Sequence, residues 1–233
     1  WPVDEPNSPT LFVLSRSTAI MGLIYLPFET IPGFTVAGTH IPAPRQVLIE
    51  IVAAQTGVMM SLFGSNPELV VGPQGYDNTY QFITATGHTL QFSVVLACTG
   101  LGSIAIFAGL IGAVRAPLGR KLKGLAIAVP IIYGLNLVRT TFIGIAFGEQ
   151  LLHIYPDTVL LLFGASDKYL VSWFISDRIL SQLLAVLALI GVTYLVVREL
   201  PEILTIIEDV LYMVTNDEYD LEETLDLPRS TKN

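Results

Sequence analysis

Cysteine is almost absent from this chain: Cys98 is alone among 233 residues, and only three histidines accompany it. A single thiol excludes an internal disulfide and any metal cluster built from several cysteines. The histidines, His40, His88 and His153, show no spacing that is typical of metal ligands. We therefore expect neither a metal ion nor another cofactor.

Charged residues are also scarce, at 14% of the chain, and the basic ones are the minority, with 12 Lys and Arg against 20 Asp and Glu. With a net charge of −8 and no basic stripe, nucleic acid is excluded as a partner. Half of the acidic residues follow Arg198. This distribution predicts a solvated acidic tail at the C-terminus.

Hydrophobic residues, in contrast, make up 52% of the chain, and the mean hydropathy is +0.62. No soluble domain of this length needs so much apolar surface. Because a membrane span must satisfy its own backbone hydrogen bonds, its apolar runs are expected to be helices. The composition therefore predicts an all-α, polytopic membrane protein.

Three apolar runs have the ~20 residues that a bilayer core demands: Ser93 to Val114, Gly124 to Phe147 and Tyr169 to Val197. The segment Arg115 to Lys123, between the first two, has four basic residues and no acidic one. Basic residues in short loops mark the cytoplasmic side. We therefore expect the first span to run inward, the second outward and the third inward, ending at Arg198.

The N-terminal third is expected to add one or two spans, for a total of four or five. Leu11 to Ile31 is a further apolar run. Pro44 to Phe63 has small and polar residues along one face, which fits either a packed span or a helix at the outer interface. The glycine-rich and polar segment Ser65 to Gln91 is typical of an external loop with short strands.

The C-terminal end has a different pattern. Pro201 to Val214 has apolar residues at helical spacing, which predicts a cytoplasmic amphipathic helix. We therefore divide the chain into a transmembrane domain, residues 1–198, and a cytoplasmic helix with an acidic tail, residues 199–233.

Cys98 and two intramembrane arginines are predicted to lie at similar depth. Measured from the basic ends of their spans at ~1.5 Å per residue, Cys98 lies roughly 25 Å away, Arg139 roughly 24 Å and Arg178 roughly 30 Å. All three fall in the outer half of the membrane. Arginine inside a bilayer is costly, so it normally faces a polar cavity, although snorkelling to the headgroups is the alternative.

A lone cysteine in an apolar helix is usually inert, but a thiolate beside arginine is a nucleophile. We interpret Cys98 as the nucleophile, with Arg139 and Arg178 as oxyanion and substrate ligands. Arginine cannot act as a base. His88, His153 and Asp177 are candidates for that role.

Two polar residues adjoin the arginines. Asn136 lies three residues before Arg139 on the same helical face, so its amide is expected to orient the guanidinium. Asp177 is expected to pair with Arg139, with the loops or with the adjacent Arg178.

These residues resemble the motifs of the exosortase and archaeosortase membrane transpeptidases. The motifs are Ala-Cys-Thr-Gly at residues 97–100, Asn-x-x-Arg at residues 136–139, and a third basic residue at position 178. Arginine in the third position resembles the archaeosortase A branch. The resemblance implies catalysis by Cys98, Arg139 and Arg178.

The resemblance also implies a substrate and a location. Substrates would be S-layer type glycoproteins whose C-terminal signal has a Pro-Gly-Phe motif, a transmembrane helix and a basic tail. The new C-terminus would pass to a membrane lipid at the outer face of the plasma membrane. Family members have further spans upstream, so the resemblance implies an N-terminally truncated chain.

Two other functions fit the same residues. An anion transporter would use Arg139 and Arg178 to bind its substrate, and should tolerate Cys98→Ala. A lipid acyltransferase would use the same thiol and would be distinguished by the acyl group on Cys98.

Overall fold

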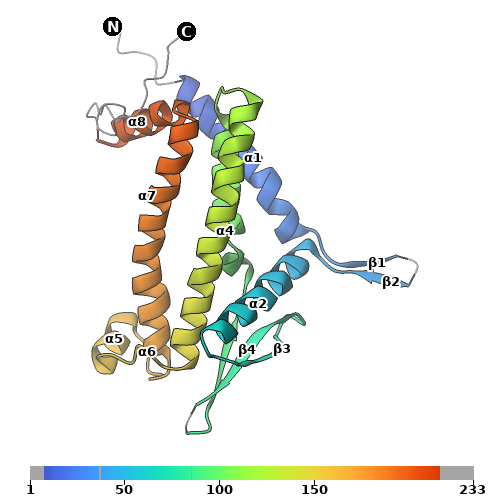
Figure 1. The fold of residues 1–233 in the computed structure, drawn as a ribbon, viewed down its shortest axis with the longest axis vertical. Helices are drawn as coiled ribbons and strands as arrows, with labels where there is room; N and C mark the ends of the chain where they lie inside the picture. Colours follow the sequence, from blue (N-terminus) through green and yellow to red (C-terminus); the bar gives the residue numbers. More distant parts are fainter. Residues whose placement is uncertain (1–7, 37, 85, 216–233) are drawn as a thin grey trace. The chain divides into compact units, whose positions relative to one another are not determined.

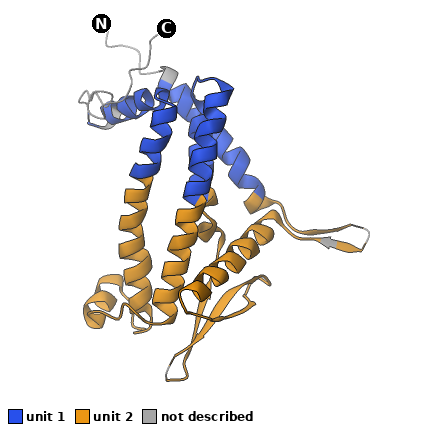
Figure 2. Ribbon diagram, in the orientation of Figure 1, with its two compact units in different colours: residues 1–27, 102–132, 190–233 blue, residues 28–101, 133–189 orange. Residues whose placement is uncertain are grey.

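The computed structural model describes residues 8–36, 38–84 and 86–215, and the predicted all-α class is confirmed. Helices predominate, and two small antiparallel sheets are formed by strands in the N-terminal half (Figure 1). The chain divides into two compact units, each built from separate stretches of sequence (Figure 2). Unit 1 comprises residues 1–27, 102–132 and 190–233, and unit 2 comprises residues 28–101 and 133–189.

Three helical segments in the described part of the chain are long and apolar enough to cross a membrane: Thr10–Thr30, Leu118–Gly148 and Leu170–Glu199. They correspond to three of the expected spans. The prediction of one continuous span over Ser93 to Val114 is wrong, because the apolar helix there, α3, covers only Leu101–Ala113. The residues before it form a strand and a short 3₁₀ helix instead.

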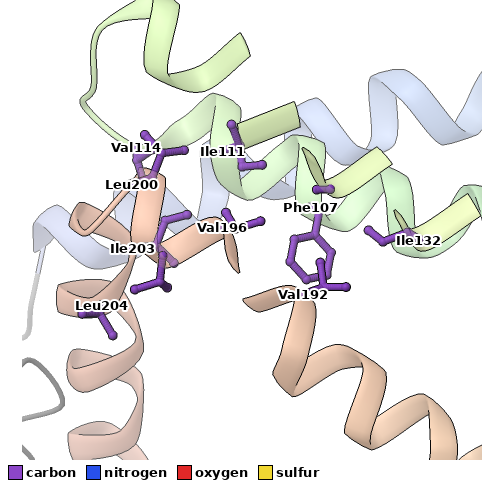
Figure 3. Packing of buried hydrophobic residues seen from close by; sticks show 11 residues of the cluster. Phe107, Ile111, Val114, Ile132, Val192, Val196, Leu200, Ile203 and Leu204 are labelled. Atoms are coloured by element: carbon purple, nitrogen blue, oxygen red, sulfur yellow. The ribbon is translucent and has the colours of Figure 1, made fainter. Parts of the chain in front are cut away.

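Unit 1 packs the ends of several helices around an apolar core. It contains α1 (Ser8–Thr30) up to residue 27, most of α3, the start of α4 (Leu118–Gly148) and the end of α7 (Ser181–Glu199). Phe107 of α3 lies against Val192 of α7 in this core (Figure 3).

The helices α1 and α3 approach closely in unit 1. A Cβ at Gly109 would lie 2.5 Å from the carbonyl oxygen of Ser17. Glycine at this position therefore lets the two backbones touch, as small residues do between membrane helices.

The predicted C-terminal amphipathic helix is confirmed as α8, Glu202–Thr215. Its apolar face buries Ile203 and Leu204 in the core of unit 1. On its polar side Glu202 pairs with Arg120 of α4. The predicted acidic tail lies outside the described residues.

Unit 2 contains the remaining elements. They are the hairpin β1 (Phe34–Val36) and β2 (Thr39–Ile41), α2 (Pro44–Leu62), a sheet of β3 (Glu68–Val71), β4 (Asp77–Ile83) and β5 (Thr89–Ser93), the 3₁₀ helix η1 (Leu96–Thr99), the second half of α4, α5 (Pro156–Phe163), α6 (Leu170–Trp173), the π-helix η2 (Phe174–Leu180) and the start of α7.

The core of unit 2 joins α2, the three-stranded sheet and α4. Met60 of α2, Tyr80 and Phe92 of the sheet, and Ile143 and Phe147 of α4 are buried together. Helix α2 is not among the described helices that are apolar enough to span a membrane. The three strands confirm the short strands expected within the external segment, and the sheet order is β3-β4-β5.

Candidate active site

A cavity of about 410 Å³ lies within unit 2. One wall is formed by the chain from β5 to η1, a second by α4, and a third by α6 and η2. Its lining residues are Gln91, Phe92, Ser93, Val95, Ala97, Cys98, Arg139, Thr140, Ile143, Phe147, Leu170, Trp173 and Asp177. This volume is typical of a site for a small ligand or a short peptide segment.

Cys98 lies in η1, between the sheet and α3, and is partly exposed. Its N–H donates to the carbonyl of Val95 at 2.8 Å. The Thr99 hydroxyl donates to the carbonyl of Leu96 at 2.7 Å and accepts from the N–H of Leu101 at 3.3 Å. Short side-chain to backbone bonds of this kind stabilise a turn against a continuous helix. They keep the thiol in a compact turn at the cavity wall.

Gly100 ends this turn in the left-handed region, with φ of +76°. A side chain is disfavoured there. A Cβ at Gly100 would also lie 3.1 Å from the Cβ of Asn136. The last residue of the Ala-Cys-Thr-Gly motif is therefore glycine for two physical reasons, the backbone conformation and the close approach of α4.

Two residues of α4 hold the backbone of the cysteine. The Asn136 amide donates to the Cys98 carbonyl oxygen, and the Thr140 hydroxyl donates to the same oxygen at 3.2 Å. From its helical spacing, the Asn136 amide was expected to orient Arg139. The structure shows it bound to Cys98 instead, because Gly100 leaves room for the asparagine beside the turn.

Arg139 and Asp177 form an ion pair at the cavity, with 2.8 Å between Arg139 Nη2 and Asp177 Oδ1. Their side chains are 31% and 18% exposed. Arg139 Nε is buried and has no hydrogen-bond partner among the described residues. The pairing of Asp177 with Arg139 was one of the arrangements expected from the sequence.

Arg178 is placed differently. Its side chain is 56% exposed, its Nε lies 3.8 Å from Asp177 Oδ2, and its guanidinium lies over the Trp173 ring at 5.3 Å from the centroid. Arg178 does not line the cavity that Cys98 and Arg139 share in the described part of the chain. Asp177 therefore lies between the two guanidiniums and contacts both.

A π-helix, η2, carries Asp177 and Arg178. Such turns are rare and widen the helix by one residue per turn, and they occur often at functional sites. The ordinary α-helix resumes at Ser181. Within this turn the Asp177 side chain contacts Arg139, and the side chain of its neighbour Arg178 is exposed.

The charges around the thiol have opposite effects. Burial raises the pKa of the Cys98 thiol above its ordinary value, and the negative charge of Asp177 raises it further. A backbone hydrogen bond at Val95 and the positive charge of Arg139 act in the opposite direction without cancelling the rise. Neither candidate histidine lines the cavity. His88 stacks on Tyr169 with ring centroids 4.4 Å apart, and His153 lies in the segment between α4 and α5. Asp177 is thus the one carboxylate among the described residues of the cavity wall.

Sequence analysis missed Thr140 and Trp173. Thr140 lies four residues after Asn136, so the helical spacing alone places both on one face of α4. Trp173, at the end of α6, carries no such signal in the sequence. No group of three or more potential metal ligands occurs within residues 8–36, 38–84 and 86–215.

Comparison with known proteins identifies the family. Residues 8–167 match the sequence model described as transmembrane exosortase. Archaeosortase A of Haloferax volcanii is 66% identical over 218 residues, which cover 94% of this chain and 72% of that protein. Archaeosortase A of Natronomonas pharaonis is 40% identical over 215 residues, which cover 89% of this chain and 64% of that protein. No solved structure gives a significant match.

The family match includes Cys98, Asn136 and Arg139, whereas Arg178 lies beyond its last residue. It extends over more than half of the chain, and the identity to the Haloferax volcanii protein continues over most of the remainder. This chain therefore belongs to the transmembrane exosortase family.

Proposed function

We propose that Cys98 is the nucleophile of this membrane transpeptidase. Membership in the family makes the chain a cysteine transpeptidase that processes C-terminal sorting signals, which favours peptide chemistry over anion transport or lipid acylation. The observation that carries the assignment is that Cys98, alone among the residues of the chain in bearing a thiol, lines one cavity with Arg139.

The reaction begins when the sulfur of Cys98 loses its proton and attacks the carbonyl carbon of the scissile peptide bond. Arg139, at the cavity wall, binds the oxyanion that forms on the carbonyl oxygen. Arg178, which contacts Asp177 beside the cavity, binds a carbonyl or carboxylate of the substrate. Asp177 receives the thiol proton and passes it to the leaving amine as the C–N bond breaks, which leaves a thioester on Cys98. A nucleophile of the acceptor then attacks the thioester carbonyl and frees the thiol.

The proposed substrates are surface proteins, of the S-layer type, whose C-terminal signal has a Pro-Gly-Phe motif, a transmembrane helix and a basic tail. The proposed acceptor is a membrane lipid. We place the site on the outer side of the plasma membrane, because the basic segment Arg115 to Lys123 favours a cytoplasmic position at the opposite end of α4.

The test compares two cavity variants with a surface control in a cell-based processing assay. Cys98→Ser should abolish processing and retain substrate capture, because a hydroxyl is not ionised without a strong base. Arg139→Lys should also fail, since an ammonium lacks the planar fork of donors. Arg198→Lys, at a residue that contacts Tyr194, should process normally. Full turnover by Cys98→Ser would overturn the thiol mechanism.

A further inference from the structure

We propose that the substrate segment next to the scissile bond binds as an extended strand along the free edge of β5, adding a fourth strand to the sheet. This inference rests on the proposed function, since it concerns the peptide on which Cys98 acts. The binding surface consists of main-chain N–H and C=O groups of β5 and is separate from Arg139 and Arg178.

Strand β5 is at one edge of its sheet, because the order is β3-β4-β5. The bonds to β4 show which backbone groups remain free. The N–H of Val94 donates to the carbonyl of Asn78, and the N–H of Thr84 donates to the carbonyl of His88, at the two ends of the pairing.

Hydrogen-bonded pairs alternate along an antiparallel ladder. Leu90 and Phe92 therefore direct their N–H and C=O groups toward β4, and their side chains are buried. Thr89, Gln91 and Ser93 direct theirs outward, to the edge that no described strand pairs with.

The outward edge of β5 continues into the wall of the Cys98 cavity. Gln91, Ser93 and Val95 all line that cavity. Val95 is still extended, with φ of −116° and ψ of 171°, and the turn that carries Cys98 follows directly. At ~3.3 Å per strand residue, the path from Gln91 to Val95 is roughly 13 Å long, which four extended residues of a substrate would match.

An extended peptide suits this edge chemically. A free edge offers alternating donors and acceptors, and peptide-binding domains use such edges to hold a ligand by its main chain. Because these bonds do not read side chains, the edge would fix the direction and register of the segment. The peptide carbonyl would thereby be presented to the thiol at one position along the chain.

Cross-linking in a chain without a reactive nucleophile tests the proposal. Cys98→Ala removes the one native thiol, so Gln91→Cys in that background carries a single cysteine, and Leu69→Cys in the same background is the control. Leu69 is outward-facing on β3, at the opposite edge of the same sheet. The probe is a detergent-solubilised C-terminal fragment of a surface protein that carries the Pro-Gly-Phe motif, the transmembrane helix and the basic tail. Each version of the probe has one cysteine, placed at successive positions before the cleavage site. A short bifunctional thiol reagent then joins this cysteine to the cysteine of the enzyme variant.

We expect cross-links to Gln91→Cys at alternate probe positions, because side chains of a strand alternate between faces, and few to Leu69→Cys. Uniform cross-linking along the probe, or equal yields at both edges, would overturn strand addition. Neither result depends on Cys98 as a nucleophile, because Cys98 is absent from both variants, so the cysteine mechanism is judged separately by the processing of Cys98→Ser.

Proline variants give a second readout in the otherwise native chain. Gln91→Pro removes an outward N–H but none that bonds β4, and Leu69→Pro does the same at the β3 edge. We expect Gln91→Pro to slow processing by about tenfold, the loss of one to two peptide hydrogen bonds, and Leu69→Pro to remain near the native rate. Equal rates for the two variants, with equal amounts of folded protein, would contradict the proposal.

Discussion

Replacement of Gly100 by alanine tests how the turn at Cys98 is held. With φ of +76°, any side chain at this position costs about 1 to 2 kcal/mol. The new Cβ would also lie 3.1 Å from Asn136 Cβ and 3.3 Å from its Cγ, so the asparagine must move by a few tenths of an ångström. We expect the free energy of unfolding to fall by about 1 to 3 kcal/mol in total.

The same displacement should reduce catalysis, because Asn136 holds the Cys98 carbonyl. Small misplacements of reacting groups are costly, so we expect processing to fall by about tenfold or more. The matched control is Gly102→Ala, two residues along in α3, where a Cβ meets nothing within 4 Å. That change should be neutral or stabilise the helix by up to about 1 kcal/mol.

Thermal unfolding in detergent and processing of a tagged substrate would measure both effects. The double variant Gly100→Ala, Asn136→Ala removes the contacts with Asn136 Cγ and Nδ2 but keeps the contact with Cβ and the positive φ, so it measures how much of the loss comes from the outer atoms of the asparagine. We expect less than additive losses in stability. Equal behaviour of Gly100→Ala and Gly102→Ala would refute the account of the turn.

Three further outcomes follow from the packing and charges. Asp177→Asn removes the carboxylate that contacts both guanidiniums and carries the proton, so processing should fall by about a hundredfold or more. A native rate in the same assay would contradict its role. Burial raises the pKa of Tyr80 to about 12, above the value near 10 of an unfolded chain. The stability that neutral Tyr80 contributes is therefore complete below pH 10 and is lost as the pH rises through 12. In Tyr80→Phe, the free energy of unfolding should vary less steeply with pH over this range. Gly148→Ala would place a Cβ 2.2 Å from the Phe82 ring, so the free energy of unfolding should fall by about 1 to 3 kcal/mol. The control Gly134→Ala, whose Cβ would meet nothing within 4 Å, should show no such loss in thermal unfolding.

The sequence predicted those parts of the molecule that depend on local patterns. Hydropathy and helical spacing predicted three apolar helices and α8, and the position of Cys98 near the start of an apolar run predicted its place before α3. Strands within the polar segment were expected, but their register was not. Register depends on how side chains such as Tyr80 and Phe92 fill the core beside α2.

The sequence predicted which residues belong to the site better than it predicted how they are arranged. Cys98 and Arg139 share a cavity, whereas Arg178 lies beside it on Trp173. Local spacing could not distinguish these positions, because they depend on how α4 and η2 pack together, and no residue pattern marks the π-helix. The bond from Asn136 to the Cys98 carbonyl joins residues 38 positions apart, and it depends on how α4 packs against the turn.

Helix α3 has thirteen residues and rises about 20 Å, whereas the hydrocarbon core of a bilayer is about 30 Å thick. A helix this short leaves a mismatch of about 10 Å, which the bilayer meets by thinning or the protein by lining the gap with non-helical chain. The chain that directly precedes α3 is non-helical in β5 and forms the turn at Cys98, so these residues would line the gap if α3 lies in a bilayer. The rate of processing should accordingly vary with the acyl-chain length of the host lipid, and be fastest in thin bilayers.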